Sequence, residues 1–347
     1  GITSYVWAES VNAMLVPLGG DLYFRGADGK NVQLTQTAEP ELDPKLCKQG
    51  EKAVFVRGRE LYAIDVGSKR EVALTKGAPE GVTRGQSDFN GQEEFDEASG
   101  YWISPGCDKV AYLEVDERAV GEHPVLGYRG KKADLMEQRY PAAGARNPVV
   151  KIGILDVASK KTVWVAVPGG KEHYTGRFAW APDGSALFFQ ALDRDQKRMT
   201  LYRADSRVGV ATELASETSP GWVDFAEVRM LEKTGALVWT AARGGHIHLE
   251  TRDTQTGKIV AQLTQGAWDV TSIDAVDEAQ GFVYFTATKE SPVERQLYRV
   301  ALKGGEPVKI TSERGVHTTR VSPRAGSYVD IHSARDRAPQ AAVRDLT

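Results

Sequence analysis

Short runs of alternating apolar and polar residues recur along almost the whole chain, and this period-two pattern predicts β-strands. The runs are separated by tight turns rich in Pro, Asp and Gly, of which residues 181–184 (Ala-Pro-Asp-Gly) are the clearest example. A turn is followed by an apolar strand, then by a strand containing Leu-Tyr (residues 201–202 in one case), and commonly by a strand ending in Leu-Thr (residues 263–264). The chain is therefore predicted to be all-β and built from a repeated unit.

The repeated unit predicts a β-propeller. Four short antiparallel strands per unit, at a spacing of roughly 35 to 50 residues, are typical of propeller blades. We place about seven units over residues 1–347, starting near residues 1, 42, 99, 174, 220, 269 and 315. The first unit begins on a strand, the last ends on a fourth-strand pattern at residues 345–347, and neither end supplies an evident closing strand. We therefore expect one or more further blades upstream of residue 1.

Composition excludes several classes of function. The chain has 347 residues and a net charge of −3, and its 41% hydrophobic and 26% charged residues are ordinary for a globular protein. This charge does not favour nucleic acid or an anionic membrane, and no apolar run approaches the roughly 20 residues of a membrane span. No signal peptide opens the chain. Neither a phosphate-binding loop nor a Gly-x-Ser-x-Gly nucleophile elbow is present, so we expect no cofactor and no catalytic residue in this chain.

Candidate metal ligands are few. His246 and His248 alternate on one face of a predicted strand, but no third ligand stands at a matching spacing, so we expect packing residues and no metal site. Cys47 and Cys107 are the only cysteines, each in a turn-like context. They form neither a zinc motif nor a disulfide framework, and pairing would require their turns to be neighbours. We expect two unpaired thiols, which leaves the redox compartment unassigned.

Residues 85–100 depart from the strand pattern and predict a short acidic helix. Ser87 or Asp88 can cap the start of a helix, and Gly100 suits the left-handed residue that ends one. Two phenylalanines can pin one side of the segment, which also carries a dense set of acids. The phenylalanines are Phe89 and Phe95, and the acids are Asp88, Glu93, Glu94, Asp96 and Glu97. Residue chemistry alone leaves two interpretations open, a solvated acidic loop or a functional site.

The third unit carries the longest insertion, between residues 114 and 148. A hairpin of this length must leave its blade, and such loops are uncommon unless they bind something. An arm that reaches a second subunit and a mobile surface loop are both consistent with the residues.

Several motifs resemble those of one known family. Residues 92–105 (Gln-Glu-Glu-Phe-Asp-Glu-Ala-Ser-Gly-Tyr-Trp-Ile-Ser-Pro) resemble the double-glutamate motif of the dipeptidyl peptidase IV family in its bacterial form. Residues 137–150 resemble the family's Tyr-Pro-Lys-Ala-Gly-x-x-Asn-Pro segment, with Ala142 in place of the lysine. Residues 222–224 and 262–270 resemble blade motifs of the same family. The family also places an arginine near its glutamates, and we can match it to no position here.

The resemblance implies a function. The family pairs an eight-bladed propeller with a C-terminal α/β-hydrolase domain carrying Ser, Asp and His. Residues 1–347 would then be the substrate-gating propeller, truncated upstream and inactive alone, with the catalytic domain absent from this chain. Glu93 and Glu94 would bind the free N-terminal amine of a peptide, from which a serine dipeptidyl peptidase removes Xaa-Pro or Xaa-Ala dipeptides. Residues 114–148 would include the arm of a homodimer, and the family implies a periplasmic, cell-surface or secreted location.

Two other functions stay open at this stage. A stand-alone propeller could bind a peptide or protein partner without chemistry, and a native chain ending near residue 347 would support this alternative. A propeller that is itself an enzyme, such as a metal-dependent lactonase, would need carboxylates or histidines converging on a central channel. The sequence shows no such set.

Overall fold

The computed structural model describes residues 2, 4–128, 130, 134–168, 172–323 and 325–346. Residues 1, 3 and 347 of the predicted terminal strands, and residues 129 and 131–133 of the predicted arm, lie outside the described residues. The chain divides into two compact units. Unit 1 holds residues 1–194 and 204–212, and unit 2 holds residues 195–203 and 213–347.

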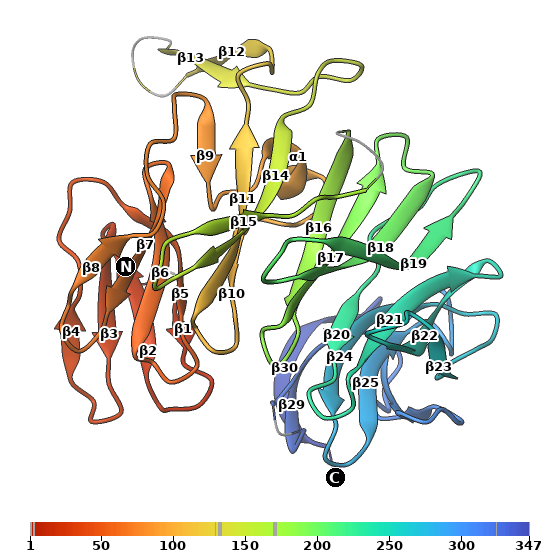
Figure 1. Ribbon diagram of the computed structural model, residues 1–347. Helices are drawn as coiled ribbons and strands as arrows, with labels where there is room; N and C mark the ends of the chain where they lie inside the picture. Colours follow the sequence, from red (N-terminus) through yellow and green to blue (C-terminus); the bar gives the residue numbers. More distant parts are fainter. Residues whose placement is uncertain are drawn as a thin grey trace. The chain divides into compact units, whose positions relative to one another are not determined.

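Three antiparallel sheets follow one another along unit 1 (Figure 1). The first contains β1 (Val6–Trp7), β2 (Met14–Leu18), β3 (Asp21–Arg25) and β4 (Asn31–Gln33), and the second contains β5 (Glu41–Leu46), β6 (Lys52–Arg57), β7 (Glu60–Asp65) and β8 (Glu71–Ala73). The third runs β10 (Tyr101–Ile103), β11 (Lys109–Asp116), β14 (Val149–Asp156) and β15 (Thr162–Trp164), and β9 (Val82–Arg84) joins it by pairing with the second half of β11.

A fourth sheet contributes residues to both units, and three more sheets belong to unit 2. The fourth contains β16 (His173–Trp180), β17 (Ala186–Asp193), β18 (Arg198–Asp205) and β19 (Ala211–Thr218), and the fifth contains β20 (Val228–Met230), β21 (Ala236–Arg243), β22 (His246–Asp253) and β23 (Ile259–Gln262). The sixth contains β24 (Val270–Asp277), β25 (Phe282–Ala287), β26 (Gln296–Ala301) and β27 (Val308–Lys309), and the last contains β28 (Val316–Val321), β29 (Ser327–Ala334) and β30 (Arg337–Asp345).

The described residues thus form seven repeated sheets, as predicted, with strands paired in chain order except in the five-stranded third sheet, where β11 pairs with both β14 and β9. The last sheet differs from the prediction because it has three strands. Residues 337–345 form one continuous strand, β30, so Asp345, where a fourth-strand pattern was expected, is the last residue of the third strand.

Strand β6 shows why these strands appear as unbroken apolar runs in the sequence. Its Phe55 packs with Leu22 of the first sheet, whereas Val54 and Val56 on the opposite face pack with Tyr101 of the third sheet. Because both faces of the second sheet are covered, successive residues of the strand point alternately to one buried face and to the other, so both sets are apolar. Strand β25 of unit 2 is buried on both faces in the same way.

The recurrent Leu-Thr ending has a structural role. In four sheets of the described chain, the threonine hydroxyl at this position, which follows Ile310 in one case, accepts a hydrogen bond from the backbone N–H of a leucine within the third strand. The pairs are Thr35 with Leu22 (2.8 Å), Thr75 with Leu61 (2.9 Å), Thr264 with Leu249 (2.9 Å) and Thr311 with Leu297 (3.1 Å). A buried backbone N–H needs such a partner, so the side chain replaces a ladder bond where the fourth strand ends.

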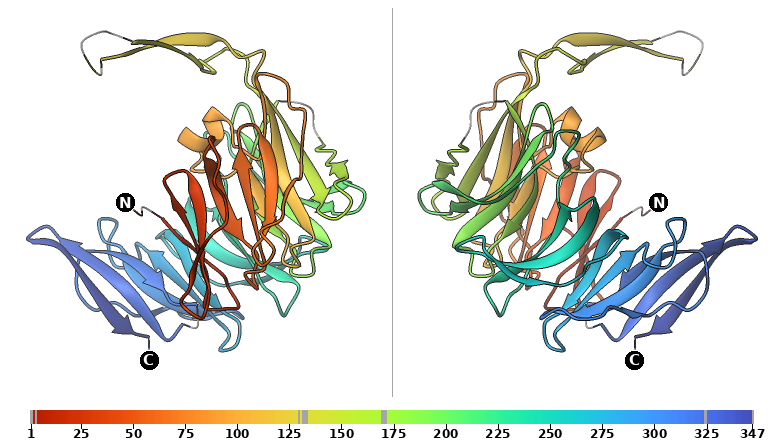
Figure 2. Two further views of the ribbon diagram at one scale, coloured as in Figure 1. Left: turned by 90° about the vertical axis from the view of Figure 1, so that its left-hand side faces the viewer. Right: turned by 90° about the vertical axis from the view of Figure 1, so that its right-hand side faces the viewer.

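The long insertion leaves its sheet, as predicted. Strands β12 (Glu122–Gly127) and β13 (Asp134–Arg139) form a separate two-stranded hairpin. Figure 2 shows this hairpin projecting away from β11 and β14, to which its two ends connect.

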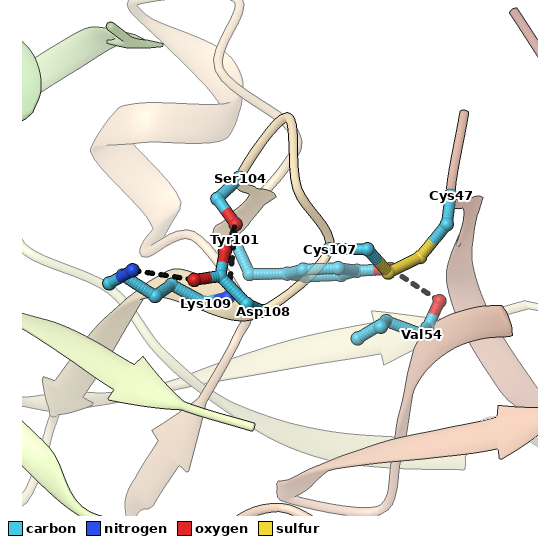
Figure 3. The surroundings of a disulfide bond; sticks show 7 residues. All are labelled: Cys47, Val54, Tyr101, Ser104, Cys107, Asp108 and Lys109. Carbon is cyan, nitrogen blue, oxygen red and sulfur yellow. Dashed lines mark hydrogen bonds and ion pairs between the residues drawn. A yellow bond between two sulfur atoms is a disulfide. The ribbon is translucent and has the colours of Figure 1, made fainter. Parts of the chain in front are cut away.

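The two cysteines are not free thiols, and that expectation was wrong. Cys47 follows β5, Cys107 lies in the turn between β10 and β11, and the two form a disulfide with their Cα atoms 5.8 Å apart (Figure 3). Beside it, the Tyr101 hydroxyl donates a hydrogen bond to the Val54 carbonyl oxygen at 2.8 Å. The two turns are neighbours because the second and third sheets pack face to face, a relation that the local sequence does not encode.

Candidate functional site

The acidic segment contains a helix shorter than predicted. Helix α1 (Phe89–Glu93) begins after Asp88, whose side chain makes no capping hydrogen bond, and the chain leaves the helix at Glu94. The Glu97 N–H then donates to the Gly91 carbonyl oxygen at 2.8 Å, which folds the chain back over the helix. α1 is the one helix among the described residues, and it is far too short and polar to cross a membrane.

Gly100 does not end this helix. Residue 99 forms an isolated bridge with Gln86, and a Cβ at Gly100 would lie 2.2–2.5 Å from the Gln86 backbone. Glycine is required here because two backbones approach closely where the segment begins and ends.

Glu93 and Glu94 are adjacent, and both side chains are exposed. Within the described residues, neither carboxylate has a hydrogen-bond or ion-pair partner. Asp96 is also exposed and takes a left-handed φ of 52°, which turns the chain after the pair.

The other two acids of the segment are partly buried. The Arg177 backbone N–H donates to the Glu97 carboxylate at 2.9 Å, and its guanidinium lies 3.8 Å from the same oxygen. Burial raises the pKa of Glu97, and Arg177 opposes this shift. Burial likewise raises the pKa of Asp88, opposed by nearby backbone N–H groups of α1. These two carboxylates belong to the scaffold of the segment, which leaves the adjacent pair Glu93 and Glu94 available to a ligand.

Aromatic contacts fix the two ends of the segment, whereas the two phenylalanines were expected to pin one side of it. Phe95 is buried and packs on Tyr174 of β16 at a ring-centroid distance of 5.0 Å. Phe89 contacts Tyr140 edge-to-face, also at 5.0 Å. α1 lies against β16, which carries both Tyr174 and Arg177 (Figure 1).

Lys45 is a functional candidate that the sequence did not single out. Its ammonium bonds to the Ser99 hydroxyl and the Tyr101 carbonyl oxygen, and Asp43 lies 3.5 Å away. Burial lowers the pKa of Lys45, and Asp43 opposes this shift. Lys45 also lines a cavity of about 360 Å³, next to the stacked rings of Trp102 and Phe178. Strand β5 appears in the sequence as an ordinary strand with a polar face, so no local signal marks this lysine.

The histidines of β22 are held by protein groups. His248 is buried, with its ring nitrogens 3.1 Å from the Thr264 hydroxyl and 2.9 Å from the Gly266 carbonyl oxygen. His246 lies 3.4 Å from the Asp269 carboxylate. In the described part of the chain, Cys47, Glu51 and Cys107 are a set of three potential metal ligands, and the disulfide occupies both of its sulfur atoms.

Repeated antiparallel sheets, with the acidic segment of residues 85–100 held between them by aromatic and polar contacts, define a class of large β-repeat domain. Comparison with known proteins identifies the family. The sequence profile described as "Dipeptidyl peptidase IV (DPP IV) N-terminal region" matches residues 17–339. The chain therefore belongs to the dipeptidyl peptidase IV family, whose N-terminal region it represents.

Relatives agree with this assignment. The chain is 30% identical over 333 residues to the probable dipeptidyl-aminopeptidase B of Emericella nidulans, covering 84% of this chain and 36% of the relative. Its fold matches Porphyromonas gingivalis dipeptidyl peptidase 4 with a TM-score of 0.86 at 21% identity, over 99% of this chain and 50% of that one. A putative dipeptidyl aminopeptidase IV from Bacteroides ovatus gives 0.83 at 21%, over 98% and 50%. The chain thus spans about a third to a half of the length of these proteins.

Proposed function

We propose that this chain is the substrate-binding β-propeller of a serine dipeptidyl peptidase, in which Glu93 and Glu94 bind the N-terminal amine of a peptide. The proposal rests on which acids of the segment at residues 85–100 are exposed and which are partly buried. Two adjacent carboxylates are exposed without protein partners among the described residues, whereas Asp88 and Glu97 are partly buried in the scaffold. Family membership, with relatives named as dipeptidyl aminopeptidases, supports the peptidase assignment.

The chemistry of an N-terminal amine suits this pair. An α-amino group has a pKa of about 7.7 to 8.0, so it is mostly charged at neutral pH. Its three N–H donors match two carboxylates, and charge-assisted hydrogen bonds are roughly twice as strong as neutral ones. Glu93 and Glu94 also stand at the C-terminal end of α1, where unpaired carbonyl groups favour a cation.

Anchoring the amine at a fixed distance from a serine nucleophile sets the length of the product. The bond two residues from the N-terminus reaches the nucleophile, so dipeptides are released, with Pro or Ala before the cut bond. A catalytic α/β-hydrolase domain outside this chain supplies the Ser, Asp and His. The propeller contributes orientation, which lowers the barrier by fixing the substrate before reaction, and it rejects peptides with blocked N-termini.

The same proposal covers architecture, assembly and location. The repeated sheets are blades of an eight-bladed propeller whose first part lies upstream, an arrangement that the fold similarity to the bacterial enzymes supports. The β12–β13 hairpin is the arm of a homodimer. The Cys47–Cys107 disulfide supports a periplasmic, cell-surface or secreted location, because disulfides persist mainly in oxidising compartments.

Substitution in the intact protein tests the amine site. Glu93→Gln and Glu94→Gln should each lower kcat/KM for a chromogenic Xaa-Pro substrate by about 10- to 100-fold, the usual effect of losing a hydrogen bond to a charged group. Asp96→Asn is the matched control, since it neutralises an exposed acid of the same segment, and it should leave kcat/KM unchanged. Full activity of both glutamine variants would disprove the amine site. An intact protein that releases no dipeptide would instead indicate a stand-alone binding module.

A further inference from the structure

We infer that Tyr140 and Asn147, from the segment between β13 and β14, are positioning residues that hold Glu93 and Glu94 where a peptide amine can reach both. The inference rests on the proposed amine site. It gives a role to the Tyr-Pro-x-Ala-Gly-x-x-Asn-Pro motif, residues 140–148, to which neither the fold nor the proposed chemistry assigns one.

Helix α1 cannot hold its own position. It has five residues, and isolated helices shorter than about 12–15 residues are marginal in water because nucleation is costly. Its N-cap residue, Asp88, contributes no side-chain capping bond. The orientation of the glutamate pair therefore depends on tertiary contacts at the two ends of the segment.

Tyr140 secures the first end. Its ring meets Phe89, the first residue of α1, edge-to-face at 5.0 Å with an interplanar angle of 77°. On the hairpin side the same ring meets His123 of β12 at 5.5 Å and 89°. The Tyr140 backbone N–H donates to the Gly121 carbonyl oxygen at 3.0 Å, which ties the ring to the base of the hairpin.

Asn147 connects both ends. The Asn90 side-chain amide donates to Asn147 Oδ1 at 3.4 Å, and Asn147 Nδ2 donates to the Tyr174 hydroxyl oxygen at 3.3 Å. Tyr174 packs on Phe95, the residue directly after the glutamate pair. The Asn147 amide thus links Asn90, which precedes the glutamate pair, to Tyr174, which packs on the residue that follows the pair. Glu93 and Glu94 lie on the short span between these two contacts. Displacement of a binding group by about 1 Å can lower a rate about 100-fold, so this span controls amine binding.

If Tyr140 and Asn147 only stabilised the fold, their loss would affect catalysis differently from the loss of positioning residues. Loss of fold stability lowers the active fraction for every substrate alike. Loss of positioning lowers activity only where the substrate has an amine to bind. The informative quantity is the ratio of kcat/KM for a free-amine dipeptide substrate to kcat/KM for its des-amino analogue.

The test measures this ratio in the intact protein. Tyr140→Ala and Asn147→Ala should each lower the ratio about tenfold or more while the des-amino rate stays constant. Tyr140→Phe is the conservative control, because it keeps the ring that contacts Phe89, and it should retain the ratio. Asn90→Ala combined with Asn147→Ala should cost no more than Asn147→Ala alone, since the single hydrogen bond of the Asn90 amide is already lost when Asn147 is replaced.

The positioning role and the amine site can fail independently of each other. A proportional fall for both substrates, or an unchanged ratio in Tyr140→Ala and Asn147→Ala, overturns the positioning role. If Glu93→Gln and Glu94→Gln collapse the ratio while those two variants do not, only the positioning role fails. If the glutamine variants themselves leave the ratio unchanged, the amine site is wrong.

Discussion

Asp88 keeps a carboxylate in a poorly solvated place at the start of α1. Burial raises its pKa above the ordinary 3.8, so the folded protein binds this proton more tightly than the unfolded chain does. The charged form therefore destabilises the fold at neutral pH, and the penalty disappears as pH falls through the folded pKa towards 3.8.

Asp88→Asn should remove this penalty. We expect the variant to unfold at higher urea concentration than the parent at pH 7, with the difference in unfolding free energy shrinking steadily as the pH is lowered to about 4. Urea titrations of both proteins at several pH values provide the measurement. A difference that does not change with pH would show that the carboxyl titrates as it does in water.

Substitution of Gly100 tests whether its backbone lies as close to that of Gln86 as the structure indicates. An alanine there would place Cβ within 2.2–2.5 Å of Gln86 backbone atoms, so Gly100→Ala should lower the unfolding free energy by about 1–3 kcal/mol, as overpacking commonly does. Gly67→Ala is the control, because a Cβ at Gly67 meets its nearest neighbour at an ordinary 3.7 Å. Equal stability of the two variants would contradict the steric argument.

The strands and turns that the sequence predicted correctly are those marked by local signals. Pro, Asp and Gly at residues 181–184 predict a turn, and the Gly184 N–H indeed donates to the Ala181 carbonyl oxygen at 2.9 Å. The Leu-Thr ending was detectable as a pattern, and its hydrogen bond to a neighbouring strand explains why it recurs. The spacing of such signals was sufficient to locate the repeated sheets.

Features that depend on packing between elements were missed or misread. Gly100 looked like a helix terminator because that role is local, whereas its actual constraint comes from Gln86. Arg177 lies on β16, some eighty residues beyond its partner Glu97, and nothing in its neighbourhood marks it. Glu93 and Glu94 were identified by resemblance to a family, since one acid among five is not distinguished by its own chemistry.

The β12–β13 hairpin exposes apolar side chains on both of its faces. Leu126 pairs across the strands with Leu135, and Val125 pairs with Met136 on the opposite face. Three of these are 54–62% exposed. An isolated two-stranded hairpin is at best marginally stable in water, which favours a partner that covers it.

Leu126→Asp should therefore weaken the proposed homodimer of the intact protein, raising its dissociation constant about tenfold or more because an interface anchor becomes a buried charge. Sedimentation velocity over a range of concentrations measures this. Gln138→Asp on the same hairpin adds the same charge without removing apolar surface and should have a much smaller effect. A parent protein that is monomeric at all concentrations would rule out the arm.

The Cys47–Cys107 bond cross-links two sheets and closes a loop of 60 residues. Removing such a cross-link costs roughly 4 kcal/mol in the chain-entropy description. Cys47→Ser with Cys107→Ser should lower the unfolding free energy by about this amount, and reduced parent protein should match the double variant. Denaturation curves with and without reductant provide the measurement, and an unchanged midpoint on reduction would contradict the stabilising role.

The same disulfide determines how the chain would respond to proteolysis. Glu93 and Glu94 are exposed, and they lie between the two linked cysteines. A glutamyl endopeptidase that cut the chain there would sever the proposed amine site yet release no fragment, because the pieces on either side stay cross-linked. The nicked protein would migrate as one band on a denaturing gel without reductant and as two bands with it. Cleavage at this site would therefore be detected by size only after the disulfide was reduced.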